Sequence, residues 1–195
     1  MSTGNDHADP DRIPPLAELS DELGVSVATL REQLQVARVL GFVEVKPKSG
    51  IRRLPYTFGP SASESLSYAI ALDRSYFESF ADLRKKIEAD YWYEAVERLS
   101  DEDKAELNAL VQRAMGMLMG VPIQIPHKEH RQLHLAIFKH VQNPFVTGIL
   151  EAYWDAYEEI GLNRYEHIEY LQDVWRFHQT IVSAIVAGNI EQGHD

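Results

Sequence analysis

The sequence contains no cysteine, and no apolar run in it approaches the roughly 20 residues that a membrane-spanning helix needs. The first absence excludes disulfides, thiolate metal ligands and a cysteine nucleophile. The second absence excludes a membrane-spanning helix, so we expect no membrane as a partner. Residues 1–11 are polar and acidic, unlike a secretory signal peptide. We therefore expect a cytoplasmic protein.

Positive charge is also scarce, because 19 Lys and Arg face 30 Asp and Glu, for a net charge of -11 over 195 residues. Over the whole chain, this excess of negative charge argues against nucleic-acid binding. Residues 12–57, however, have seven basic and five acidic side chains, whereas the chain from 58 onward has 12 basic and 22 acidic ones. The distribution predicts a small, mildly basic module joined to a larger acidic one.

The basic module begins with helical patterns and ends with alternating ones. Apolar spacing predicts helices over 16–23 and 27–40, with Gly24 ending the first and Ser26 capping the second. Residues 42–46 and 51–54 then alternate as strands around a turn at 47–50. The expected module is a helix-turn-helix followed by a β-hairpin.

The acidic part reads as an antiparallel bundle of long helices with short connections. The expected helices span 62–72, 75–98, 101–118, 127–141, 144–161 and 165–187. The predicted fold class is mainly α, with an N-terminal winged helix-turn-helix and an all-α bundle. We divide the chain into a disordered tail (1–11), a winged domain (12–55), a Pro-, Gly- and Ser-rich linker (56–65) and a helical bundle (66–195).

A helix-turn-helix with a hairpin places its second helix in the DNA major groove and its wing against the phosphates. Polar and basic residues lie where these contacts are made, although winged helices sometimes bind protein instead. The predicted DNA-binding residues are Ser26, Thr29, Arg31, Lys46, Lys48, Gly50, Arg52 and Arg53.

Three histidines form the candidate site of the bundle. His130 and His134 are four residues apart, so on a helix they point the same way and can bind one divalent metal. His178 lies on a different predicted helix, among apolar residues. Histidines spaced in this way are more often unligated, and a buried histidine with an ordinary hydrogen bond is the alternative for His178.

The stretch from Pro14 to Arg53 resembles the winged helix of GntR-family bacterial transcription regulators. The similarity lies in LAELSDELGVS, LREQL, LGFVEVKP and the wing-tip Gly50. In two respects the sequence departs from the family, which usually has Arg where Val27 stands and an additional helix before the segment that begins at Arg12. The resemblance implies operator DNA as the partner and a homodimer.

The second module resembles the FCD effector-binding domain of the FadR subfamily, through ADLRKKIE, HRQLH followed by Asn143-Pro144, and the segment around His178. The resemblance implies a metal held by His130, in the place of the family's Asp, by His134 and by His178. The family's fourth ligand would fall after Asp195. Imidazole in place of carboxylate favours Zn or Ni. The resemblance also implies a small carboxylate effector, for which Arg84 is a candidate partner; its other role is an ion pair with Glu88.

Together these features predict a transcription regulator, a repressor rather than an enzyme, controlled by a small carboxylate at a metal site. A metal-dependent enzyme and a metal-free interaction bundle are the alternatives. The zinc-protease pattern HExxH is absent, since Arg131 follows His130.

Overall fold

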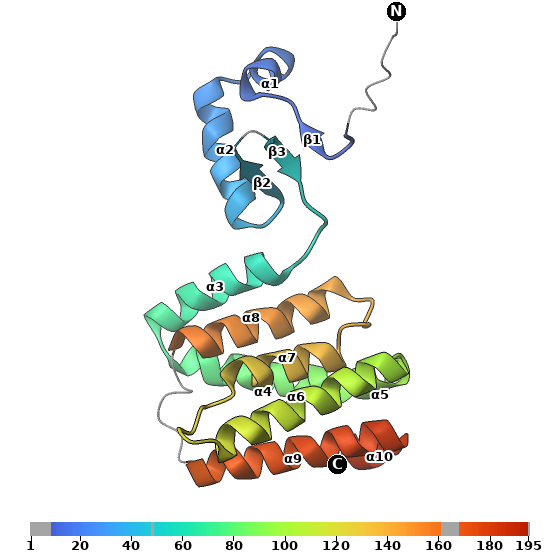
Figure 1. Cartoon of the computed structure of the whole chain (residues 1–195). Helices are drawn as coiled ribbons and strands as arrows, with labels where there is room; N and C mark the ends of the chain where they lie inside the picture. The colour runs from blue at the N-terminus through green and yellow to red at the C-terminus, as the bar shows by residue number, and fades with distance from the viewer. Residues whose placement is uncertain (1–8, 48, 161–167, 195) are drawn as a thin grey trace, which may run out of the picture.

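The computed structural model describes residues 9–47, 49–160 and 168–194 and consists of a small α/β module joined to a layered bundle of helices (Figure 1). The predicted fold class is confirmed. Lys48 and residues 1–8 of the expected tail lie outside the described residues. No helix in the described part of the chain is long and apolar enough to cross a membrane.

The N-terminal module has the predicted helices and hairpin. Helices α1 (Leu16–Leu23) and α2 (Val27–Val39) precede strands β2 (Val43–Lys46) and β3 (Gly50–Arg53). The predicted cap of α2 forms, because the Thr29 backbone N–H donates to Ser26 Oγ at 3.1 Å. Gly24 ends α1 with φ of 65°, in the left-handed region that glycine adopts without strain.

A third strand, β1 (Arg12–Ile13), was not expected from the sequence. It pairs antiparallel with β3, so that the sheet order is β1-β3-β2, and Ile13 lies opposite Ile51. Two residues are too few to show the alternation by which a strand is recognised. The pairing depends on a partner that lies far along the chain.

The bundle contains eight described helices, α3 to α10, which Figure 1 shows stacked below the N-terminal module. Their bounds are α3 Gly59–Leu72, α4 Ser75–Asp90, α5 Trp92–Glu97, α6 Asp101–Met119, α7 His127–Ile137, α8 Pro144–Ile160, α9 Ile168–Ala187 and α10 Ile190–His194.

Helix α3 begins at Gly59, inside the segment that we expected to be a linker. Proline is favourable in the first turn of a helix, and the serines of α3 bond to α8, where Ser63 donates to Asp155 and Ser67 to Glu159, each at 3.1 Å. Gly148 of α8 permits this close packing, because a Cβ there would lie 2.6 Å from the Gly59 nitrogen. The Pro, Gly and Ser content therefore marks a helix start and a tight helix contact.

Two other expected helices differ in the structure, and one helix is additional. The expected helix over 75–98 is broken at Tyr91 into α4 and α5, and α7 ends at Ile137 rather than at 141. The short α10 was not expected, and it is fixed by a distant contact: the Trp92 indole N–H donates to the Ile190 carbonyl at 2.9 Å. Contacts between segments decide these ends.

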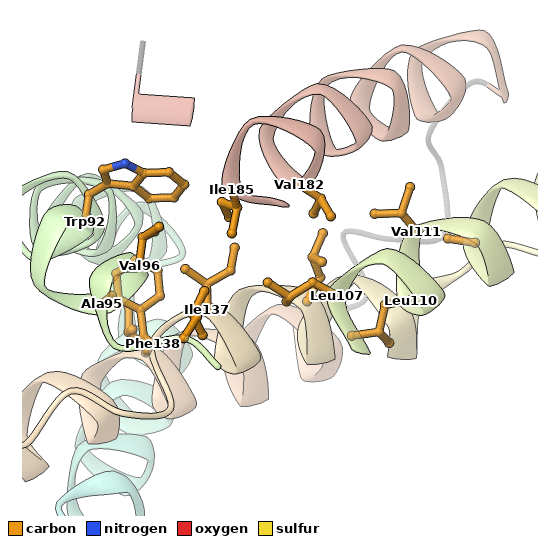
Figure 2. Packing of buried hydrophobic residues seen from close by; sticks show 14 of the residues in the cluster. Trp92, Ala95, Val96, Leu107, Leu110, Val111, Ile137, Phe138, Val182 and Ile185 are labelled. Carbon is orange, nitrogen blue, oxygen red and sulfur yellow. The ribbon is translucent and has the colours of Figure 1, made fainter. Parts of the chain in front are cut away.

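The main core lies between α5, α6, α7 and α9, where buried side chains from all four helices meet (Figure 2). A second, aromatic cluster joins α3, α4 and α8. Its buried members are Leu66, Phe77, Tyr153, Trp154 and Ala156.

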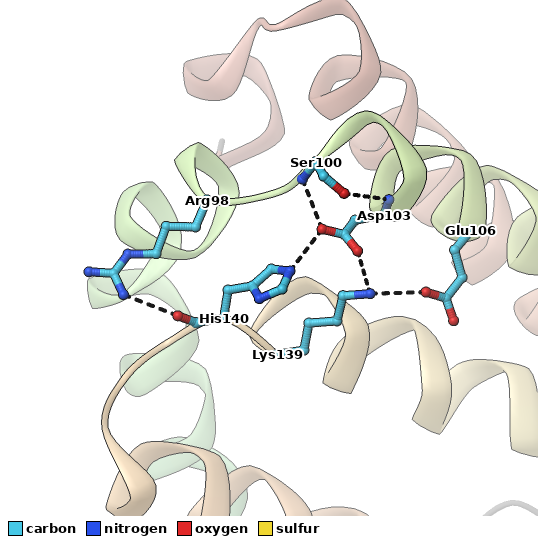
Figure 3. Close-up of polar contacts among 6 residues, drawn as sticks. All are labelled: Arg98, Ser100, Asp103, Glu106, Lys139 and His140. Carbon is cyan, nitrogen blue, oxygen red and sulfur yellow. Dashed lines mark hydrogen bonds and ion pairs between the residues drawn. The ribbon is translucent and has the colours of Figure 1, made fainter.

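A polar cluster fixes the start of α6 to the end of α7 (Figure 3). Asp103 and Ser100 form the reciprocal capping box of α6. The Asp103 carboxylate also binds Lys139 Nζ at 2.5 Å and His140 Nε2 at 2.8 Å. Helix α7, which has two of the candidate metal ligands, is thereby held against α6.

Candidate metal centre and DNA-binding surface

The three predicted histidines come together in the interior of the bundle. His130 and His134 lie one turn apart on α7, and His178 faces them from α9. One potential ligand atom of each ring lies within 4.8 Å of those of the other two. Helix periodicity brings the first pair together, and packing of the bundle brings in the third.

An aromatic shell surrounds the cluster. Trp154 of α8 packs against His130 and His134, with ring centroids 4.7 and 4.9 Å apart. Trp175 of α9 packs against His178 at 5.2 Å. Both indoles are almost completely buried, and they cover one side of the imidazole cluster.

The hydrogen bonds of the cluster are incomplete. His134 Nδ1 lies 3.2 Å from Glu88 Oε1, and Arg84 Nη1 donates to the other carboxylate oxygen of Glu88 at 2.6 Å. His178 Nε2 is buried and has no hydrogen-bond partner among the described residues. Buried polar atoms are nearly always paired, so this nitrogen calls for an explanation.

Burial lowers the pKa of two of these imidazoles, His130 and His178, and so keeps them neutral. It lowers the pKa of His178 to about 3, with further contributions from His134 and Arg84. Burial also lowers the pKa of His130 strongly, and the neighbouring His134, His178 and Arg84 act in the same direction. A neutral imidazole retains the nitrogen lone pair that binds a metal. For the Glu88 carboxyl, burial raises the pKa, but His134 and Arg84 outweigh it, so that the net pKa is lowered.

The donor set fits a transition metal. Three imidazole nitrogens converge, one of them without a hydrogen-bond partner in the described structure, and imidazole ligands suit Zn, Ni, Cu and Fe. Glu88 bonds one nitrogen of His134, the arrangement by which a carboxylate orients a ligating histidine. His127 begins α7 but is not part of the group, and lines a separate pocket of about 60 Å³ beside His130.

Arg84 forms the ion pair with Glu88 that was one of its two expected roles. Its guanidinium also lies over the Tyr153 ring, 4.5 Å from the centroid. The Arg84 Nε is buried and has no hydrogen-bond partner within the described part of the chain. The side chain is thus held beside the histidines, with one donor unused, and its role toward an effector stays a prediction.

The predicted DNA-binding residues share one module but differ in their contacts. Ser26 and Thr29 lie at the N-terminus of α2 with their hydroxyl oxygens 2.9 Å apart. Arg31 is exposed at the start of the second turn of α2. On the wing, Lys46 pairs with Glu44, and Gly50 begins β3 with φ of 78°. These placements leave DNA contact a prediction.

Two wing arginines are bound by acidic residues that precede β1. Arg52 pairs with Asp9 and Arg53 with Asp11, each at 2.9 Å. Both arginine side chains remain more than 40% exposed, so the pairs are weak and exchangeable. Arg52 and Arg53 therefore remain accessible to a phosphate.

Sequence reasoning identified the histidines but missed the contact between Glu88 and His134. The sequence predicts Glu88 only as an ion-pair partner of Arg84. These two residues are four positions apart, so both side chains lie on one face of α4. Only the packing of α4 against the rest of the bundle shows that this face meets His134.

A winged module joined to an all-helical domain is the architecture of a DNA-binding transcription regulator. Residues 79–195 match the FCD domain family, and the chain belongs to it. It is a GntR-family transcription regulator with an FCD domain, as the resemblance predicted.

Similar proteins support this assignment. The chain is 26% identical over 192 residues to the Uxu operon regulator of Haemophilus influenzae, covering 93% of this chain and 68% of that protein. Its fold is similar to that of Streptococcus agalactiae GntR, with a TM-score of 0.63, 20% identity, and coverage of 94% and 83% of the two chains. E. coli McbR/YncC has a TM-score of 0.53 at 20% identity, with coverage of 95% and 81%.

Proposed function

We propose that this regulator is a repressor that binds operator DNA as a homodimer and is controlled by a small carboxylate at a metal bound by His130, His134 and His178. The winged domain (12–55) supplies the DNA contacts and the bundle (66–195) the effector site. Residues 56–65 join them, with the start of α3 included. A bound Zn²⁺ or Ni²⁺ would offer the carboxylate a Lewis-acidic partner.

The observation that carries the metal site is His178 Nε2, which has no hydrogen-bond partner among the described residues and lies where three imidazoles meet. A histidine that served only the core would be expected to have a hydrogen bond. A metal ion supplies the missing partner and explains why two helices direct three imidazoles to one point.

The DNA-binding part rests on the winged module and its exposed polar residues. Helix α2 presents Thr29 and Arg31 to solvent, and the wing presents Arg52 and Arg53. A two-fold dimer places two such helices on the half-sites of a palindrome. The names of the similar proteins, an operon regulator and GntR regulators, agree with this function.

The metal site is tested by adding metal ions to metal-stripped protein and measuring its melting temperature. We expect Zn²⁺ or Ni²⁺ to raise the melting temperature, because a ligand that binds only the folded state stabilises it. His134→Ala should abolish this rise. His140→Ala, which alters the Asp103 cluster instead, should leave the metal-induced rise intact. A melting curve that Zn²⁺, Ni²⁺ and Mn²⁺ all leave unchanged at neutral pH would refute the proposal.

A further inference from the structure

We infer that the effector is an apolar monocarboxylate about the size of a single aromatic ring, and not a polyhydroxylated sugar acid. The inference rests on the proposed function and adds the chemical class of the ligand. It follows from the pocket that opens beside His134 and His178.

The pocket lies between α4, α7, α9 and α10 and has a volume of about 210 Å³. His134 and His178 both line it, so a molecule inside would reach two of the three candidate metal ligands. A cavity of about 150 Å³ lined by aliphatic and aromatic groups is large enough for benzene. The pocket therefore suits a one-ring or short branched-chain acid.

Most of the wall is apolar. Besides Ala89 and Gly193, the apolar lining comes from large side chains: Trp92, Leu133, Ile137, Phe138 and Ile181. Figure 2 shows Trp92, Ile137 and Phe138 close together at the edge of the core. Such a wall favours an apolar ligand, because binding removes apolar surface of both from water.

The pocket offers few groups to several hydroxyls, because its described polar lining is limited to the charged or imidazole side chains of Lys85, Glu88, His134, His178 and His194. Among its described lining residues there is no Ser, Thr, Asn, Gln or Tyr. The indole N–H of Trp92 is already bonded to the Ile190 carbonyl. The hydroxyls of a sugar acid would lose their hydrogen bonds to water and gain few in return, which costs free energy for each one buried.

The charges of the pocket suit one carboxylate. On α4, Lys86 pairs with Asp82, whereas Lys85 lines the pocket and has no ion pair among the residues that the structure describes. Glu88, whose carboxylate is held by Arg84 and His134, also lines the pocket. Lys85 would attract a single carboxylate, and Glu88 would repel a second one.

The test compares four probes on the full chain loaded with Zn²⁺, by calorimetry and melting temperature. Benzoate and hexanoate represent the proposed class, gluconate the sugar acids, and benzamide a neutral analogue of benzoate. We expect benzoate and hexanoate to bind at least about tenfold more tightly than gluconate or benzamide, which corresponds to a difference of about 1.4 kcal/mol.

Two variants locate the binding. Ile181→Phe fills the pocket from α9, and Ala89→Phe narrows it from the exposed side of α4, where a larger side chain leaves the core intact. Val186→Phe, on an exposed position of α9 outside the pocket, is the matched control. Both pocket variants should bind benzoate at least about tenfold more weakly while still binding Zn²⁺. The control Val186→Phe should bind both benzoate and Zn²⁺ as the wild type does.

Equal or tighter binding of gluconate, or benzoate affinity unaltered in both pocket variants, would overturn the inference. The proposed metal site is judged separately, by Zn²⁺ binding alone. A protein that binds Zn²⁺ but shows no preference for benzoate refutes only the ligand class. One that binds no Zn²⁺ but prefers benzoate refutes only the metal.

Discussion

Glu88 contacts two members of the candidate site, Arg84 through one carboxylate oxygen and His134 through the other. Its bond to Nδ1 leaves Nε2 of His134 for the metal. We expect Glu88→Ala to weaken Zn²⁺ binding roughly 10- to 100-fold, as loss of such a supporting carboxylate does in other metal sites.

Calorimetric titration with Zn²⁺ measures this effect. Asp82→Asn is the matched control, because it removes from the same helix an exposed carboxylate that pairs with Lys86 and lies outside the histidine cluster. Zn²⁺ affinity that is unchanged in Glu88→Ala would mean that the carboxylate does not support the ligand.

Arg31 is the basic residue best placed to read a base. It is exposed near the start of α2 and forms no ion pair with the described residues. We expect Arg31→Ala to cost about 1–3 kcal/mol of operator binding and much less binding to random DNA. Gel shifts with both DNAs measure the difference.

Arg113→Ala provides the comparison, because Arg113 is exposed on α6, in the helical bundle. It removes the same charge from outside the winged module. Equal loss of operator and random DNA binding in Arg31→Ala would show that Arg31 contacts only phosphate.

At the scale of elements, the junction of α6 and α7 depends on one carboxylate. The side-chain bond from Lys139 lowers the pKa of Asp103 most, followed by the backbone N–H of Ser100, and His140 adds to the effect. Because the folded pKa lies below the unfolded value of 3.8, this stabilisation is fully present above about pH 4 and is lost as the pH falls through the folded pKa.

We therefore expect Asp103→Asn to be less stable than the wild type near neutral pH, with a difference that shrinks between about pH 4 and pH 2. Chemical unfolding at several pH values measures it. Asp101→Asn, in the same first turn of α6 but outside the cluster, should show a smaller and flatter difference. A pH-independent difference for Asp103→Asn would contradict the assigned ion pairs.

In the whole molecule, a row of aromatic rings connects the winged module to α8. Phe42 stacks with Tyr56 at 6.4 Å, and Phe145 contacts both Tyr56 and Phe58, at 6.0 and 5.3 Å. Helix α8 also holds Trp154 against the histidines. One helix thus touches both the candidate metal site and the connection to the DNA-binding module.

We expect Phe145→Ala to reduce the effect of metal and carboxylate on operator affinity while leaving Zn²⁺ affinity unchanged. Coupling between two ligands is a free energy shared by both sites, so a looser connection lowers it without changing either site alone. Operator titrations with and without Zn²⁺ and benzoate measure the ratio of the two operator affinities. Tyr68→Ala truncates an exposed ring on α3, outside the aromatic row, and should leave this ratio at its wild-type value.

The sequence by itself determined the features that depend on neighbours along the chain. The Ser26 cap, the capping box at Ser100 and the hairpin follow from local hydrogen bonding and turn geometry. The pairing of His130 with His134 follows from the helix repeat. The family resemblance followed from motifs of the same local kind.

Only the tertiary structure decided what depends on distant partners. The two-residue strand β1, the early start of α3 against Gly148 and the helix α10 under Trp92 exist because another segment meets them. The same holds for the approach of His178 and Glu88 to His134. Their free energy comes from burial and pairing across the bundle, which no local pattern of residues records.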